Sequence, residues 1–433
     1  MTSIMSRPRL GGVRAFLTSG PMAARGFPWL LTGQFTSNVG DQCYAIAVPW
    51  LILSSGGGPS RLGVVLACYG ISRTAALPAG GALADRFGSR AVMMVTDAVR
   101  FGLVLVLAAA CVTVTPGFIV LALVSAGLGA CGGVFVPASF ALLPGALPEK
   151  DLSAGYSMSS AATQLGGLLG PVIGGVLVAT VGPPTALFVD AASYLVSSGA
   201  LLALRIPKAA PREKDPDGNE VTFRSVLLRG RFLQVVLVAA LIGNFVYAGT
   251  ADVALPTLAH HDFGAGGYGI LLSGLGAGMI VGTLSARWKP QRLAPSSVIV
   301  ILALIMGAAV AAVPFAGGLA GATVCITVFA AANGWSGTII MTTLQLWAPR
   351  HVLARVMSVM LMAMLGTFPL SVAVTGWAVA RFGATPSFLI AGAAMAIAIL
   401  WAATRPAFRN YRPSDQFASE AEQAPAVSAE EAR

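Results

Sequence analysis

The chain has 433 residues, of which 56% are hydrophobic and only 10% are charged, and its formal net charge is +10. A soluble domain is about a quarter charged, so this composition excludes an ordinary water-soluble protein and indicates a chain embedded in a lipid bilayer. The five cysteines have neither metal-ligand nor CxxC spacing, and we expect no metal, no cofactor and no redox motif.

Twelve apolar segments follow one another, each long enough to cross the roughly 30 Å hydrocarbon core of a bilayer as a helix. The first apolar segment is followed by no small-residue cleavage site, so we expect it to be retained as a helix. The fold class expected is all-α integral membrane, with twelve transmembrane helices in two pseudo-symmetric six-helix bundles. The predicted helices cover 28–53, 62–84, 91–113, 118–140, 153–179, 184–204, 232–257, 265–286, 295–315, 318–346, 356–380 and 385–404.

The polar segments give the expected domain organisation and topology. Of the 27 Lys and Arg residues, 23 fall in segments that a cytoplasmic N-terminus would place on the cytoplasmic side, as the positive-inside rule requires. We therefore expect a multi-pass protein of the cell (inner or plasma) membrane with both termini cytoplasmic, and the net charge needs no nucleic-acid partner. The expected parts are a cytoplasmic N-terminus (1–26), an N-terminal bundle (27–204), a cytoplasmic linker (205–231), a C-terminal bundle (232–404) and a disordered cytoplasmic tail (405–433).

The two predicted bundles share an internal repeat. Gly81 to Arg86 aligns with Gly282 to Arg287 at an offset of 201 residues (282 against 81), and Gly182 aligns with Gly383 at the same offset. One offset kept across most of both halves predicts duplication of a six-helix unit in parallel topology, an arrangement typical of transporters.

The segment after the second predicted helix carries a specific motif. Residues 81–90 read Gly-Ala-Leu-Ala-Asp-Arg-Phe-Gly-Ser-Arg and match the loop motif G-x-L-A-D-R-x-G-x-R. The chain thus resembles the major facilitator superfamily, and within it the branch of bacterial exporters that includes the enterobactin exporter. The resemblance implies a cytoplasmic latch in which Asp85 docks against the eleventh helix, where a helix N-terminus favours an anion. The alternative is a positive-inside loop with a turn glycine. The expected latch residues are Gly81, Asp85, Arg86, Gly88 and Arg90, supported from the third helix by Asp97 and Arg100.

A second motif lies in the fifth predicted helix. Residues 166–175 read Gly-Gly-Leu-Leu-Gly-Pro-Val-Ile-Gly-Gly and match the motif G-x-x-x-G-P-x-x-G-G of drug-exporting antiporters in that superfamily, so export is favoured over import. Pro171 removes one backbone hydrogen bond and permits a kink. The family fold implies that helices five and eight face one another across the two halves, and we expect their glycines to form a moving seam. The alternative is glycines that are merely common in membrane helices. The seam residues are Gly166, Gly170, Gly174 and Gly175 on helix five, and Gly274, Gly278 and Gly282 on helix eight.

Charged side chains inside the apolar segments need a partner or a purpose, because each costs about 2.5–3.5 kcal/mol at a helix centre on insertion scales. Asp41 and Arg73 are predicted at similar depth in the first two helices. Either Asp41 carries a coupled proton, since burial favours the neutral form of a carboxyl group, or it forms a fixed ion pair with Arg73. Asp190 and Asp252 are expected nearer the outer ends, within reach of water. The three histidines, His260, His261 and His351, are expected in loops.

The function favoured by these features is proton-coupled export of a small apolar or amphipathic compound, such as a drug, a siderophore or a secondary metabolite. We expect a monomer whose partners are the bilayer, the small molecule and protons. The alternative on the same fold is a facilitator or importer of a polar metabolite. An enzyme is not expected, because the chain has no HExxH motif and no intramembrane histidine, and the absence of a GxxxxGK[ST] loop argues against an ATP-driven pump. The resemblance implies a central cavity, and its candidate residues, some of which would only bond between helices, are Gln34, Asn38, Asp41, Arg73, Asn244, Tyr247, Asn333 and Trp335.

Overall fold

The computed structural model describes residues 20–24, 26–114, 116–148, 151–204, 230–286, 294–348, 356, 359–360 and 362–409. Most of the predicted N-terminal segment, linker and tail lies outside the described residues, as does His351. Within the described ranges the regular structure is helical and no strand occurs.

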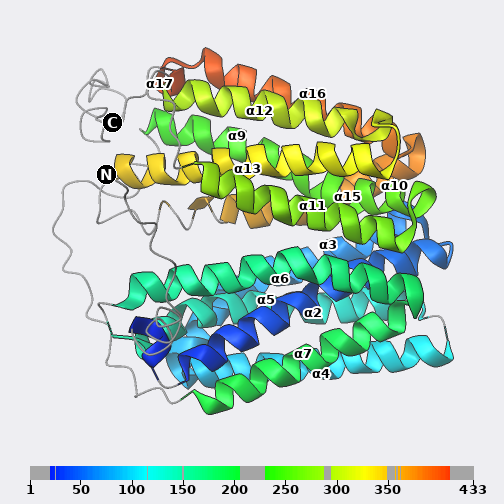
Figure 1. The fold of residues 1–433 in the computed structure, drawn as a ribbon, viewed down its shortest axis with the longest axis vertical. Coiled ribbons are helices and arrows are strands. Elements are labelled where there is room, and N and C mark those ends of the chain that lie inside the picture. The colour runs from blue at the N-terminus through cyan, green and yellow to red at the C-terminus, as the bar shows by residue number, and fades with distance from the viewer. Residues whose placement is uncertain are drawn as a thin grey trace, which may run out of the picture. The chain divides into compact units, whose positions relative to one another are not determined.

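Figure 1 colours the described helices in chain order, from blue to red. The first element is a short 3-10 helix, η1 (Gly20–Ala23). The elements of the first half are α2 (Phe27–Ser54), α3 (Gly58–Phe87), α4 (Ser89–Thr113), α5 (Phe118–Ala146), α6 (Leu152–Thr180) and α7 (Pro183–Ala203). Those of the second half are α9 (Arg231–Gly249), the π-helix η3 (Thr250–Ala254), α10 (Leu255–Asp262), α11 (Gly264–Ser285), α12 (Pro295–Ala312), η4 (Val313–Phe315), α13 (Leu319–Trp347), α15 (Phe368–Phe382), α16 (Ala384–Thr404) and α17 (Pro406–Arg409).

The number of spanning helices follows from their length and hydropathy. Among the described residues, eleven helical segments after α2 are long and apolar enough to cross a membrane. Helix α2 has 28 residues and therefore the length, but polar side chains in its middle, such as Asn38 and Asp41, lower its mean hydropathy. With α2 as the twelfth, the predicted all-α, twelve-helix architecture is confirmed.

The described residues form two compact units. Unit 1 takes those of Met1–Val48 and Ser72–Glu213, and unit 2 takes those of Pro49–Ile71 and Lys214–Arg433. The boundary passes inside α2, next to Pro49, and inside α3. The predicted division into halves at the 205–231 linker stays a prediction.

The internal repeat is visible in the helix limits. Both ends of α13 lie 201 residues after those of α5 (319 against 118, 347 against 146), and the same offset relates α16 to α7 (384 against 183). Gly182 and Gly383, which precede α7 and α16, have φ of 104° and 90°, a region that glycine enters without a steric penalty. The two six-helix halves therefore share local backbone geometry as well as sequence spacing.

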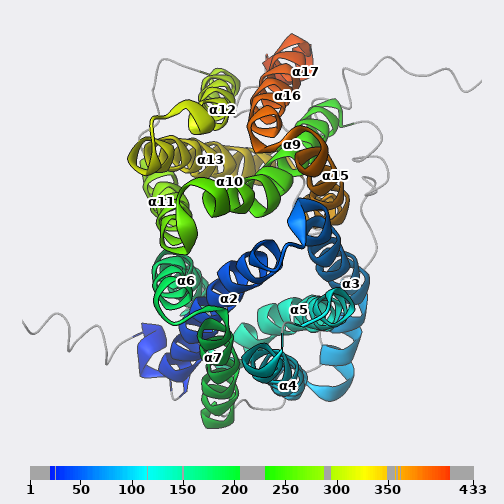
Figure 2. The ribbon, with the colours of Figure 1, turned by 90° about the vertical axis from the view of Figure 1, so that its right-hand side faces the viewer.

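Figure 2 shows α2, α4, α5, α6 and α7 of unit 1 grouped together, with α2 crossing the group obliquely. One end of this unit has an apolar core that includes Phe27 of α2, Met93 of α4, Leu142 of α5 and Leu201 of α7, each at most 2% exposed. This core holds the ends of the four helices together. The polar side chains described below lie further along the same helices.

The glycine face of α6 packs against α2. A Cβ atom added at Gly166, Gly170 or Gly174 would come within 2.7 to 3.0 Å of Asn38, Gln42 or Cys43. Without a Cβ, the two backbones can approach closely. These three glycines therefore pack against a helix of the same unit, and their role in a seam with helix eight stays a prediction.

The glycine face of α11 packs in the same way against α13 of unit 2. A Cβ added at Gly274 would lie 2.8 Å from the Thr327 hydroxyl, and one at Gly282 would meet the carbonyl oxygen of Ala331. In Figure 1 α11 and α13 lie side by side, and they are in contact along their length. The glycines of α11 thus serve close helix packing within unit 2, and the predicted seam between halves stays a prediction.

Candidate functional site

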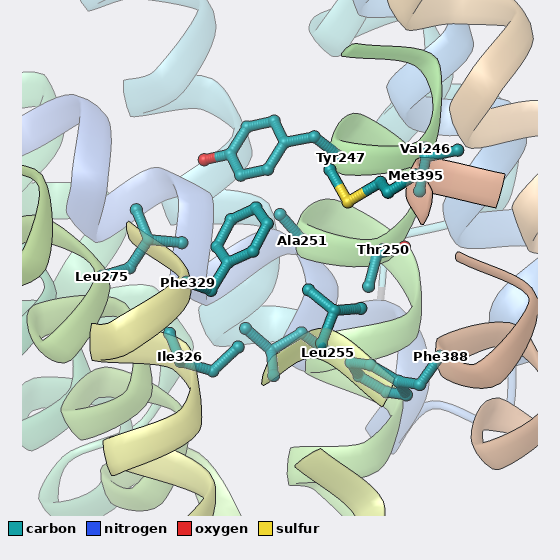
Figure 3. A pocket seen from close by; sticks show the side chains of 11 residues that line it. Val246, Tyr247, Thr250, Ala251, Leu255, Leu275, Ile326, Phe329, Phe388 and Met395 are labelled. Carbon is teal, nitrogen blue, oxygen red and sulfur yellow. The ribbon is translucent and has the colours of Figure 1, made fainter. Parts of the chain in front are cut away.

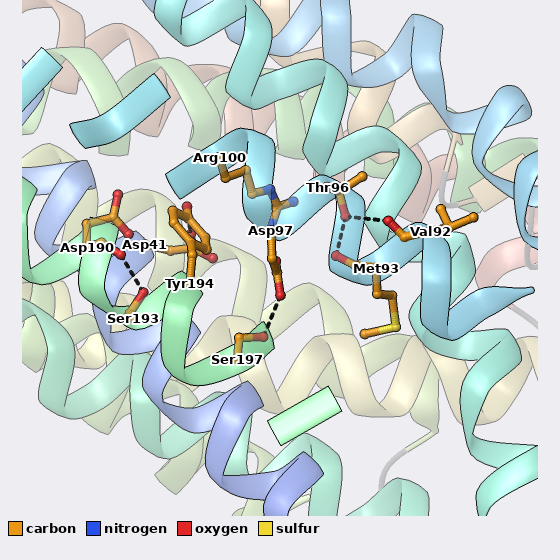
Figure 4. A network of polar contacts seen from close by, with 10 residues as sticks. All are labelled: Asp41, Val92, Met93, Thr96, Asp97, Arg100, Asp190, Ser193, Tyr194 and Ser197. Atoms are coloured by element: carbon orange, nitrogen blue, oxygen red, sulfur yellow. Dashed lines mark hydrogen bonds and ion pairs between the residues drawn. The ribbon is translucent and has the colours of Figure 1, made fainter. Parts of the chain in front are cut away.

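A cluster of ionisable side chains lies inside unit 1, on α2, α4 and α7 (Figure 4). On its outer side Asp41 of α2 is exposed and accepts a hydrogen bond of 2.7 Å from the hydroxyl of Tyr194 on α7, which is 3% exposed. The role of Asp41 as a proton carrier stays a prediction. Its ion pair with Arg73, a half-buried residue of α3, stays a prediction.

The middle of the cluster is an ion pair between neighbouring turns of α4. Arg100 Nη1 lies 3.8 Å from Asp97 Oδ1, and the Ser197 hydroxyl of α7 donates to Asp97 Oδ2 at 2.7 Å. The Arg100 guanidinium lies over two rings, 4.6 Å from the centroid of Phe135 and 5.6 Å from that of Tyr194. Cation–π contacts of this kind are strongest away from water, so α4, α5 and α7 meet at Arg100.

Asp190 of α7 is the third carboxyl group, and its side chain is fully buried. Neither carboxylate oxygen has a hydrogen-bond partner among the described residues. The expectation that Asp190 reaches water is wrong, because its side chain lies against the backbone of α2, where an added Cβ at Gly40 would be 2.8 Å from Asp190 Oδ1.

The sequence contained a signal for this cluster. Asp190, Ser193, Tyr194 and Ser197 recur at spacings of three and four, so they line one face of a helix. Ser193, Tyr194 and Ser197 were not predicted as site residues, because the charged residues were considered one at a time. Asp252, by contrast, is half-buried in η3 of unit 2.

The remaining candidates from the first helix pair with α6. Gln34 accepts a 2.5 Å hydrogen bond from the Ser159 hydroxyl, and the side chain of Asn38 lies against Gly166. Gln34 thus makes a bond between helices, an outcome expected for some of the polar candidates.

The predicted latch residues lie at the junction of α3 and α4. Arg90 donates to the carbonyl oxygens of Leu201 (2.7 Å) and Leu202 (2.9 Å) in the last turn of α7, a site where cations are favoured. Asp85 is exposed, and its docking against the eleventh helix stays a prediction. Since Arg90 and Asp97 both bond to α7, this helix connects the motif to the cluster. Gly81 and Gly88 have open space where a Cβ would be, and the Arg86 guanidinium lies over the Phe87 ring.

A cavity of about 320 Å³ lies within unit 2, lined by residues of α9, α11, α12, α13 and α16 among others. Three predicted candidates, Asn244, Tyr247 and Asn333, come together in its lining. The Asn244 amide donates to the Met364 carbonyl oxygen and, at 2.9 Å, to the Thr367 hydroxyl, so its own oxygen remains as an acceptor. Trp335 is not part of this lining, and its indole nitrogen is buried with no hydrogen-bond partner in the described part of the chain.

Methionine is the most frequent residue in the cavity wall, and we call this site the methionine cavity. Six of the chain's 14 methionines line it, and the described residues of its wall include no charged side chain. Methionine is flexible and polarizable, so its side chain adapts to ligands of different shape. These six are Met279, Met306, Met341, Met360, Met364 and Met395.

A smaller apolar pocket of about 10 Å³ lies beside η3 (Figure 3). The Tyr247 ring stacks on Phe329 at 5.7 Å between centroids, and Tyr247 and Met395 line both this pocket and the methionine cavity. A volume of this size is barely enough for one water molecule, so of these two cavities only the methionine cavity has room for an organic compound. His260 and His261 lie in α10, so the expectation that they lie in loops is wrong.

The sequence model of the Major Facilitator Superfamily matches residues 30–364. The chain belongs to this superfamily. Known structures agree on the fold of this superfamily member: a variant of the nucleoside transporter NupG aligns with a TM-score of 0.71 over 87% of this chain and 98% of its own, at 13% identity. A D-xylose-proton symporter aligns with a TM-score of 0.68 over 89% of this chain and 97% of its own, at 15% identity.

Curated relatives include multidrug efflux pumps. "Multidrug efflux pump Tap" of Mycolicibacterium fortuitum is 25% identical over 346 residues, which cover 76% of this chain and 83% of that protein. The protein of the same name in Mycobacterium tuberculosis (strain ATCC 25618 / H37Rv) is 31% identical over 193 residues, 42% of this chain and 44% of that protein. The match therefore spans less than half of the Mycobacterium tuberculosis protein.

Proposed function

We propose that this member of the superfamily is a secondary transporter of the cell membrane that exports a small apolar or amphipathic compound in exchange for protons. The observation that carries the proposal is the methionine cavity, which is large enough for an organic ligand and has no charged side chain among the described residues of its wall. Relatives that are named multidrug efflux pumps support the direction.

The chemistry of the cavity wall argues for an apolar cargo rather than a sugar. Small-molecule sites are mostly apolar with a few placed polar groups, and here those groups include Asn244, Tyr247, Asn333 and Ser336. A sugar needs a hydrogen-bond partner for most of its hydroxyls, and leaving polar groups unpaired is costly. The wall offers too few partners, so import of a polar metabolite is the weaker alternative.

Accumulation of two dyes tests this proposal. Nile red, which is neutral, and ethidium, which is cationic, are loaded into cells with and without the protein, and with and without a protonophore. We expect the protein to lower Nile red accumulation several-fold and the protonophore to abolish the difference. Equal accumulation of both dyes in all conditions would contradict the proposal.

A substitution that fills the methionine cavity tests whether it is the binding site for the exported compound. A Cβ at Gly337, which lines the cavity on α13, meets no atom within 4 Å, so Gly337→Phe can place its ring in the open space. We expect this variant to reach the membrane but lose Nile red export at least about tenfold, since about 1.4 kcal/mol of lost binding is a factor of ten. The matched control is Gly199→Phe, because Gly199 of α7 is exposed with equally open space.

A further inference from the structure

The carboxyl group of Asp190 is enclosed without a donor. Its residue has 0% exposure, and both oxygens have no hydrogen-bond partner among the described residues. Gly40 makes this possible, because any larger residue would put a Cβ against the carboxyl group. A buried carboxylate accepts hydrogen bonds only and is costly when none is offered, whereas a protonated carboxyl group is uncharged.

The hydrogen-bond donors around Asp190 bond to other groups. The Ser193 hydroxyl donates to the backbone carbonyl of Asp190 at 2.7 Å, not to its carboxyl group. Tyr194, which Figure 4 shows beside both acids, donates to Asp41. Ser197 donates to Asp97.

The charged and titratable groups facing Asp190 come from three helices. They are Asp41 and the Cys43 thiol on α2, Arg100 on α4, and Tyr194 on α7 itself, while Asp97 of α4 faces Arg100 and Asp41. Three carboxyl groups therefore share the neighbourhood of the Arg100 guanidinium, which lies nearest to Asp97. Adjacent carboxylates disfavour ionisation of all members at once, and Asp190 is the member without a donor.

We propose that Asp190 binds the proton that is exchanged for cargo, and that it holds this proton in the conformation described here. The inference rests on the proposed proton-coupled export and names the residue that performs the coupling. On release, the helices move so that Tyr194 comes within hydrogen-bond distance of Asp190. The O–H bond of Asp190 then breaks and its electron pair stays on the carboxylate, while the Tyr194 oxygen takes this proton and gives its own proton to Asp41, from which it passes to water. Tyr194 and Asp41 are unchanged after the transfer.

This assignment differs from the sequence-based choice of Asp41. Asp41 is exposed and already has a donor, so it is suited to passing a proton on. Asp190 is suited to holding a proton, because the carboxylate that forms on release has no hydrogen-bond donor until the helices around it move.

Infrared spectroscopy of the purified protein tests the inference without any cargo. A protonated carboxyl group has a C=O stretching band that a carboxylate lacks. We expect this band at neutral pH in the wild type, its loss in Asp190→Asn and its retention in Asp41→Asn and in the control Asp252→Asn. In Asp190→Glu, which keeps the acid, the band should be shifted rather than lost. A band that survives in Asp190→Asn would overturn the inference.

Transport of Nile red separates this inference from the function on which it rests. Absence of export by the wild type contradicts the proposed function itself. If the wild type exports Nile red, Asp190→Asn should still bind the dye with unchanged affinity, while the protonophore-sensitive part of export falls at least about tenfold. Protonophore-sensitive export at the wild-type rate in Asp190→Asn would overturn the inference and leave the proposed function standing.

Discussion

The guanidinium of Arg100 connects three helices at the scale of single residues. It pairs with Asp97, which has 0% exposure, and lies over rings from α5 and α7. Removing one partner of a buried pair leaves the other charge uncompensated, which costs far more than removing both. Arg100 is therefore expected to matter for stability as much as for transport.

We predict that Arg100→Gln lowers the free energy of unfolding by about 3–5 kcal/mol. The double variant Asp97→Asn/Arg100→Gln should recover more than half of this loss, because no buried charge then lacks its partner. Thermal or denaturant unfolding in detergent measures both values. A double variant no more stable than Arg100→Gln alone would mean that packing of the Arg100 stem, not charge, sets the loss.

At this scale the sequence could predict charged positions but not their surroundings. Asp41, Asp97 and Arg100 are conspicuous because they interrupt apolar segments. The burial of Asp190 and the exposure of Asp41 depend on which helix face meets which neighbour. Position along the chain predicts depth but not that orientation, so Asp190 was assigned the wrong surroundings.

At the scale of elements, the pair α11 and α13 depends on the absence of side chains. Gly282 packs so closely that an added Cβ would meet the Ala331 backbone, while Gly334 of α13 packs against Met279 of α11. Close approach of this kind increases van der Waals contact between helices in a membrane. The glycines of α11 are thus expected to determine stability rather than motion.

We predict that Gly282→Val destabilises the protein by about 1–3 kcal/mol, the usual cost of overpacking. The control is Gly199→Val in α7, where a Cβ meets no atom within 4 Å. Thermal unfolding of both variants in detergent checks this. Equal unfolding temperatures for the two variants would show that α11 can move away from α13 at little cost.

The positions of the helices were largely predictable from the sequence, whereas their exact limits and internal irregularities were not. The predicted 184–204 corresponds to α7 at Pro183–Ala203, whereas the predicted 118–140 ends short of α5, which continues to Ala146. Hydropathy detects the part of a helix within the bilayer, but a helix continues until its backbone geometry changes. The π-helix η3 is invisible to hydropathy, because one extra residue in a turn leaves the average unchanged.

At the scale of the whole molecule, topology is the main open prediction. The distribution of Lys and Arg predicts both termini in the cytoplasm. Reporter fusions test it: an alkaline phosphatase fused at either end should be inactive, because it folds only outside the cytoplasm, and a green fluorescent protein there should fluoresce. An active phosphatase at one end would require an odd number of spans.

The boundary between the two units at Pro49 lies inside a helix and so affects how that helix can bend. Proline has no N–H group, so the carbonyl of Ala45 lacks its usual helical hydrogen bond one turn before the boundary between units, and helices bend most readily at such points. Two long helices, α2 and α3, each contribute residues to both units. Each of these helices contains a proline, Pro49 in α2 and Pro78 in α3, so each has a point where bending is easiest. Because both helices belong to both units, a displacement within either unit is expected to bend one of them.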